Sequence, residues 1–223
     1  MPILDGIFSG AAMRGRLGDF VVYQLNGKTV MRRIGKVSGK KYKEGASFER
    51  MRQNRQEFGL AVQLSKQIYG IPRRKSLQLF GPQFSGRLHG AFRKLIQKGR
   101  GAPGERSFET DYLESLDGFP LNASKPEHGC LVTSAGYFDR AKASFNFSKY
   151  LIEKEKDAER VFIMLVALSD VVFDVDKGYK VQYPEWHGKR KVVLAEDFSD
   201  FDGLRLEGEL PDGVGLMVVV ARL

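Results

Sequence analysis

Histidine and cysteine are the residue types in this 223-residue sequence whose chemistry is easiest to recognise. His89, His128 and His187 are far apart, and none has a second histidine or a cysteine at metal-ligand spacing. The single cysteine, Cys130, lies two residues after His128. Catalytic Cys–His pairs, however, are defined by geometry in the fold and not by adjacency in the sequence. A lone cysteine also excludes an intramolecular disulfide and any multi-cysteine zinc or iron–sulfur site.

Three short segments match ligand-binding motifs only in part. The acidic segments 173–178 (FDVDKG) and 196–203 (EDFSDFDG) lack the distal bidentate glutamate of a calcium loop. Residues 99–105 (GRGAPGE) match G-x-G-x-x-G, but a dinucleotide site needs a strand before the glycines, and here a helix precedes them. No Walker, G-x-S-x-G or H-E-x-x-H motif is present. We therefore expect a non-enzymatic protein with no catalytic residue, no metal site and no cofactor.

The basic residues are distributed unevenly along the chain. Residues 1–106 contain 22 basic and 6 acidic residues, a net charge of +16, whereas residues 107–223 contain 14 basic and 21 acidic residues, a net charge of −7. Such a split is typical of an anion-facing module attached to a different, self-contained one.

The best local structural signal is a β-hairpin. The aromatic and β-branched runs 19–25 and 28–34 flank Asn26-Gly27, a residue pair that a type I′ turn prefers because both positions need φ > 0. Residues 6–18 are rich in glycine and alanine and show no periodicity, so we expect residues 1–18 to form a flexible basic arm. After the hairpin, lysines separated by glycines over residues 35–45 predict a flexible cationic strap.

Two amphipathic helices follow. Ser47 is a candidate N-cap for a helix that runs to about residue 69, and a second apolar stripe predicts a helix over residues 84–98. Basic residues occupy the other faces of both helices, where they could bind phosphate groups. The candidate nucleic-acid-binding residues are Arg14, Arg16, Lys28, Arg32, Arg33, Lys36, Lys40, Lys41, Lys43, Arg50, Arg52, Arg55, Arg73, Arg74 and Lys75.

The remaining chain reads as β-structure after a short helical segment over residues 107–116. Seven short apolar or alternating runs occur at 143–151, 161–168, 171–175, 179–183, 191–194, 204–210 and 216–223, several of them separated by turn residues. The predicted fold class is α+β, with an N-terminal basic β-hairpin, two helices and a C-terminal antiparallel β-sandwich of immunoglobulin-like size. Its segments are the arm 1–18, a hairpin–helix region 19–100, a linker 101–107 and an acidic sandwich domain 108–223.

The basic half carries a resemblance to a known family. Residues 15–33 (GRLGDFVVYQLNGKTVMRR) and 48–64 (FERMRQNRQEFGLAVQL) resemble an uncharacterised family of Bacteroidota and phage-associated proteins. The matching positions are Gly15, Gly18, Val21, Val22, Tyr23, Asn26, Gly27, Lys28 and Arg32. The sequence departs from the family at KEGAS, residues 43–47, where an Asn-Pro-Arg-Thr-like lead-in is frequent. The resemblance implies an architecture and a mobile-element setting, and it implies no activity.

Together these features predict a protein that binds nucleic acid, DNA or RNA, or another polyanion, mainly through phosphates. Phe20, Tyr23 and Tyr42 are either stacking partners for bases or core residues. Alternatives are a charge run that only contacts water, and a structural subunit of a phage-like or other assembly, including a homo-oligomer, that uses the arm and hairpin for subunit contacts. The sequence has neither a secretory signal nor an apolar run long enough to cross a membrane. We therefore expect a cytoplasmic protein, or a particle component if the assembly alternative holds.

Overall fold

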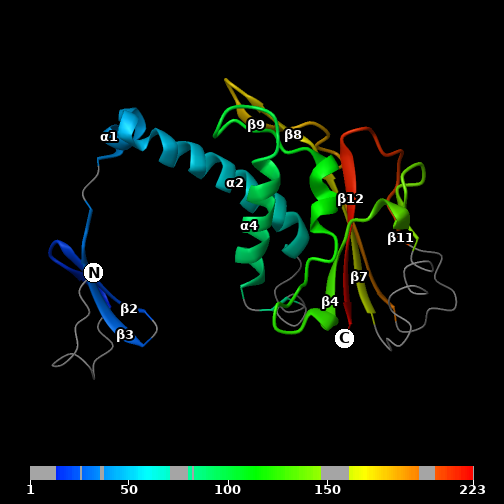
Figure 1. Cartoon of the computed structure of the whole chain (residues 1–223), viewed down its shortest axis with the longest axis horizontal. Helices are drawn as coiled ribbons and strands as arrows, with labels where there is room; N and C mark the ends of the chain where they lie inside the picture. The colour runs from blue at the N-terminus through cyan, green and yellow to red at the C-terminus, as the bar shows by residue number, and fades with distance from the viewer. Residues whose placement is uncertain are drawn as a thin grey trace. The chain divides into compact units, whose positions relative to one another are not determined.

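The computed structural model describes residues 14–25, 27–35, 38–70, 80–81, 83–146, 161–195 and 204–222. The predicted α+β class is confirmed, with an N-terminal sheet, helices and a sheet-rich C-terminal part (Figure 1). Contacts within the chain divide it into two compact units, Met1–Glu49 and Arg50–Leu223. Each unit is described separately below.

The first unit contains a small antiparallel sheet in the order β1-β2-β3. Its strands are β1 (Gly15–Leu17), β2 (Phe20–Leu25) and β3 (Lys28–Arg33). The register pairs Leu25 with Lys28, so a two-residue loop joins β2 and β3, and Gly27 in that loop has φ +76°. This confirms the predicted hairpin. The arm 1–18 is wrong over residues 15–17, because these residues pair with β2, and residues 1–13 lie outside the described part.

The segment after the hairpin is not a flexible strap where the structure describes it. Residues 38–48 form a short helix, α1 (Gly39–Glu44), and a 3₁₀ turn, η1 (Ala46–Phe48). The Ser38 side chain caps α1 by accepting a hydrogen bond from the Lys41 backbone N–H at 3.2 Å. The Tyr42 and Phe48 rings pack with their centroids 5.8 Å apart. A capped helix and an aromatic contact therefore replace the predicted glycine-rich coil.

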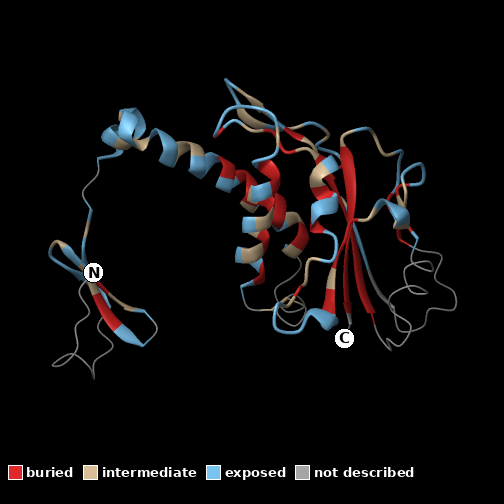
Figure 2. Ribbon diagram, in the orientation of Figure 1, coloured by how far each residue is buried: buried red, intermediate tan, exposed pale blue. Residues whose placement is uncertain are grey.

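The second unit is built around a four-stranded antiparallel sheet in the order β10-β7-β12-β4. The strands are β4 (Gly129–Val132), β7 (Val161–Ser169), β10 (Arg190–Ala195) and β12 (Val214–Arg222). Every residue of β7 is buried, in agreement with its uninterrupted apolar sequence (Figure 2). A strand of this kind must be covered on both faces.

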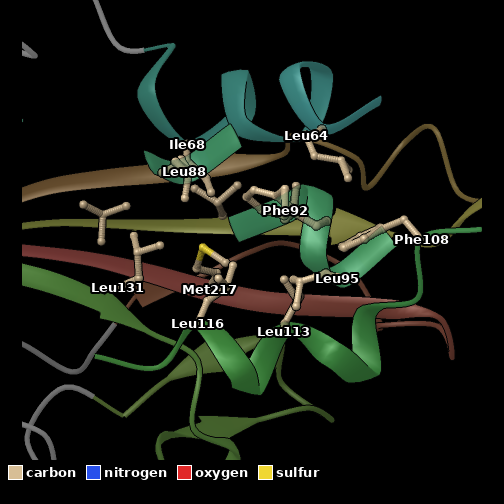
Figure 3. Packing of buried hydrophobic residues seen from close by; sticks show 14 of the residues in the cluster. Leu64, Ile68, Leu88, Phe92, Leu95, Phe108, Leu113, Leu116, Leu131 and Met217 are labelled. Atoms are coloured by element: carbon tan, nitrogen blue, oxygen red, sulfur yellow. The ribbon is translucent and has the colours of Figure 1, made fainter. Parts of the chain in front are cut away.

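Helices cover one face of this sheet. They are α2 (Glu49–Tyr69), α4 (Phe84–Ile96) and the 3₁₀ segment η2 (Thr110–Leu116), close to the predicted ranges. Figure 3 shows Leu64 and Ile68 of α2 beside Leu88 and Phe92 of α4, above Met217 of β12. Because α2, α4 and the sheet share one hydrophobic cluster, neither layer could be removed without exposing the other.

A second layer of strands covers the other face. The three-stranded sheet β11-β6-β5 consists of β11 (Leu204–Arg205), β6 (Ser144–Phe145) and β5 (Phe138–Asp139). Phe145, Leu204 and the buried Trp186 share one hydrophobic cluster with alternate residues of β7 and β12. A separate hairpin pairs β8 (Val171–Asp174) with β9 (Gly178–Val181). Sheet-on-sheet packing is thus present on one face only, since helices occupy the other.

The predicted linker at residues 101–107 is instead packed on the second unit, with Gly104 and Ser107 buried and residues 101–103 exposed. Gly104 is buried, and its N–H donates to the Glu57 carboxylate on α2 at 2.9 Å. Phe108, which follows directly, is fully buried and pairs with Val171. The observed division lies between Glu49 and Arg50, and α2 and α4 share one hydrophobic cluster with the strands of the second unit.

Within the described ranges, no helix has the combination of length and apolarity that crossing a membrane requires.

Candidate nucleic-acid interface

The register of the first unit's sheet places three of the predicted cations on one face. Arg16 pairs with Val21, and Val21 pairs with Arg32, so these residues form one row across the three strands. Lys28 lies on the same face because it is four residues from Arg32 along β3. Arg16, Lys28 and Arg32 are all exposed, and we call the side of the sheet that they share the cationic face.

The side chains on this face are held by local contacts. The Arg16 Nε–H donates to the Gly18 carbonyl at 3.0 Å, and the Arg32 guanidinium carbon lies 5.8 Å from the centre of the Tyr23 ring. The α-carbons of Arg16 and Arg32 are two strand spacings apart, about 10 Å. Strands β1, β2 and β3 contain no acidic residue. The cations of the face therefore have no carboxylate on their own strands to neutralise them.

Arg33 lies on the opposite face of the same sheet. It pairs with Phe20 and makes a long ion contact of 3.8 Å with Asp19. Leu17, the third member of this row, is 62% exposed, and Phe20 is 39% exposed. The sequence therefore placed Arg32 and Arg33 correctly on different sides, and the structure separates Tyr23 from Phe20 in the same way.

The other predicted cations are distributed over two helices. Lys40, Lys41 and Lys43 are exposed on α1. Lys41 and Lys43 lie in its last turn, where the negative end of the helix dipole stabilises a positive charge. Arg50, Arg52 and Arg55 lie on the first two turns of α2, which belong to the second unit and contain no buried residue (Figure 2). Arg14 is exposed just before β1. Lys36, Arg73, Arg74 and Lys75 lie outside the described residues.

The basic outer face predicted for the second helix is largely used inside the fold. Arg87 is half-buried and donates to the Pro120 carbonyl at 2.8 Å and the Leu121 carbonyl at 3.3 Å. Arg93 donates to the Asn54 side chain on α2 at 3.0 Å, and Lys98 donates to Ser115 at 3.2 Å. These side chains join elements of the second unit, so the net charge of residues 1–106 overstates the cation surface available to a partner.

Sequence reasoning missed a buried polar network in the second unit. Glu57, 2% exposed, accepts hydrogen bonds from the Gly104 N–H and, at 3.1 Å, from Arg106 Nη1. The Tyr179 hydroxyl on β9 donates to the Gly104 carbonyl at 2.9 Å. Burial, together with the smaller effects of the nearby Glu57 and Glu105 charges, raises the pKa of Tyr179 to about 12. The only sequence signal was an acid three residues before Leu60, the first leucine of a buried stripe, and it indicates no long-range partner.

Two of the three histidines each lie beside one polar group of the fold. His89 Nε2 lies 3.0 Å from the Tyr69 hydroxyl, and burial together with the Lys66 charge lowers its pKa. His187 Nδ1 accepts a hydrogen bond from the Ser169 N–H at 3.4 Å, and burial lowers its pKa. In the part of the chain that the structure describes, no three His, Cys, Asp or Glu side chains are grouped to hold a metal ion.

Comparison with known proteins adds no relative. A scan against protein-family models, a search of curated proteins and a search of solved structures each returned no match.

Proposed function

We propose that the protein is a non-enzymatic nucleic-acid-binding protein whose N-terminal unit makes the contact, mainly through phosphate groups. The observation that carries this proposal is the cationic face. Three exposed cations share one side of a three-stranded sheet that has no acidic residue in its strands. Arginine and lysine side chains in such an arrangement neutralise successive phosphates of a polyanion and release its counterions.

The exposed lysines of α1 support the same function. They belong to the same compact unit as the cationic face and follow it directly along the chain. Lysine acts as a strongly hydrated point charge that contacts phosphate without base readout. The proposal therefore predicts affinity with little sequence preference.

A salt-dependent titration tests the proposal. Fluorescence anisotropy of labelled DNA and RNA oligonucleotides, measured with the full chain across a range of salt, should give a linear fall of log K with log salt. The three cations of the face should contribute about −2 to −3 to the slope, and the R16A/R32A double variant should make the slope less steep by about 1.5 to 2. Binding that is absent, or that does not respond to salt, would refute the proposal.

The matched control is Arg33→Ala. It removes the same charge from the neighbouring residue of β3, but its side chain lies on the opposite face. The slope should stay near that of the unmodified chain. If Arg33→Ala and Arg32→Ala weaken binding equally, net charge and not the cationic face accounts for the affinity.

A second candidate is an assembly subunit, in line with the resemblance to phage-associated proteins. The observation that favours it is the exposed Leu17–Phe20 pair on the face opposite the cations, next to an outer strand, β3, whose far edge pairs with none of the described strands. Light scattering after size exclusion would support it by showing a stoichiometric oligomer that Phe20→Thr dissociates. A monomer at all concentrations would count against it.

A further inference from the structure

The central strand of the cationic face differs in chemistry from the two strands beside it. All the residues that β2 contributes to this face are apolar or aromatic: Val21, Tyr23 and Leu25. The cations come only from the flanking strands, Arg16 from β1 and Lys28 and Arg32 from β3. The face is therefore an apolar strip that the buried Val30 extends onto β3, with Arg16 on one side of it and Lys28 and Arg32 on the other.

We infer that this face binds single-stranded nucleic acid, with bases against the β2 strip and phosphates at the margins. The inference rests on the proposed function and specifies its substrate. A single strand has apolar base faces free for stacking and charged phosphates beside them, so both parts of the face would be matched. In a duplex the base faces are already stacked inside, and phosphates and polar groove edges would meet the apolar strip.

The dimensions and accessibility of the strip fit this ligand. Val21 and Leu25 are four residues apart on one strand, about 13 Å, comparable to the sheet surfaces on which two or three bases stack. Leu25 is 48% exposed, and Val21 and Tyr23 are half-buried. Tyr23 lies opposite the buried Val30, and the Arg32 guanidinium is over its ring. An arginine and an aromatic ring held together in this way give a base a preformed surface to stack on.

The width of the sheet also argues against insertion into a duplex groove at the β1 end. A two-stranded ribbon fits the major groove, which is about 12 Å wide. Where β1 pairs with β2, three strands span about 10 Å between the outer α-carbons alone, before any side chain is added. Arg16 and Arg32 lie in this three-stranded part, so the two side chains could not both reach the base edges of one major groove.

The test compares a single strand with the duplex of the same sequence at fixed salt, using the full chain and labelled oligonucleotides. We expect the single strand to bind at least about tenfold more tightly. Tyr23→Val should weaken single-strand binding by about 5- to 150-fold, the range for losing one stacked base, with the salt slope unchanged because no phosphate contact is removed. Tyr23→Phe, which keeps the ring, should retain the affinity.

A second pair of variants protects the test against misfolding at the half-buried Tyr23. Leu25→Thr changes an exposed residue at the end of the strip and should also weaken single-strand binding, by several-fold. Its control, Leu17→Thr, makes the same change at an exposed leucine on the opposite face and should have no effect. Equal or tighter duplex binding, or affinities unchanged by both Tyr23→Val and Leu25→Thr, would overturn the inference and leave phosphate binding in place. No binding to any nucleic acid would overturn the proposed function as well.

Discussion

Glu57 offers the sharpest test of how the second unit is held together. Its side chain is 3% exposed and accepts two charge-assisted hydrogen bonds, from the Gly104 N–H at 2.9 Å and from Arg106 at 3.1 Å. Glu57→Ala leaves both donors without this acceptor. Breaking a fully buried ion pair costs about 3–5 kcal/mol, but the Arg106 side chain is 25% exposed and retains some hydration. We therefore expect a loss of about 3 kcal/mol in the free energy of unfolding.

Glu57→Gln tests the charge of this acceptor. Gly104 and Arg106 donate to the same oxygen, Oε1, so an amide oxygen in its place can still accept from both while the ionic part of the Arg106 contact is lost, and we expect a smaller loss of about 1–2 kcal/mol. Urea unfolding followed by Trp186 fluorescence measures both variants, because this tryptophan is the only one in the chain and is buried in the second unit. Glu114→Ala, an exposed acid on η2, is the control and should change stability by less than about 0.5 kcal/mol. A loss below about 1 kcal/mol for Glu57→Ala would refute the reasoning.

Three further predictions follow from other side chains. In alkaline difference spectra, with Tyr179→Phe as the reference, Tyr179 should ionise near pH 12. Glu57→Gln should lower this pKa, because the negative charge near the hydroxyl is then removed, and an unchanged pKa would exclude the electrostatic link. Because burial lowers the pKa of His187 in the folded state, the unfolded chain takes up the proton first, and the free energy of unfolding should fall as pH drops below about 6.5. In urea titrations at several pH values, His187→Gln should weaken this dependence, and an identical pH profile would contradict the prediction. Arg87→Ala should cost about 1–2 kcal/mol of stability yet leave the affinity for nucleic acid unchanged, since its guanidinium binds carbonyls of its own chain; a loss of affinity in the anisotropy titration without a loss of stability would reverse that assignment.

The elements that could be predicted from sequence are those with local signals. The hairpin follows from the residue pair at 26–27 between two β-branched runs, and α2 and α4 follow from apolar stripes with helical spacing. The prediction of a flexible strap over residues 35–45 is wrong, because Ser38 caps a helix there despite the glycines at both ends of that helix. Strand β1 has no β-forming signal of its own and is defined by pairing with β2.

The features that sequence could not predict depend on contacts between distant residues. The boundary between units lies at Glu49 and not near residue 101, because Leu64, Phe92 and Met217 meet in one cluster although they are far apart in the chain. The second helix was predicted to present a basic face, which includes Arg87, whereas the fold uses this side chain to bind carbonyls. Arg16, Lys28 and Arg32 were predicted as separate candidate residues, and both their common face and its apolar centre became visible only when the register was known.

The nine buried residues of β7 have a consequence for how the chain must fold. This strand is apolar on both sides, and its main partner β12 begins only at Val214. Its apolar side chains therefore cannot be fully buried until the C-terminal residues of the chain have been synthesised and have folded. An apolar strand that is exposed in a partly folded chain is prone to intermolecular β-pairing. The eight residues before it, 153–160 (EKEKDAER), are all charged except Ala158. Charged residues that flank an apolar strand discourage such association. Neutralising them should lower the yield of refolded protein more than its final stability.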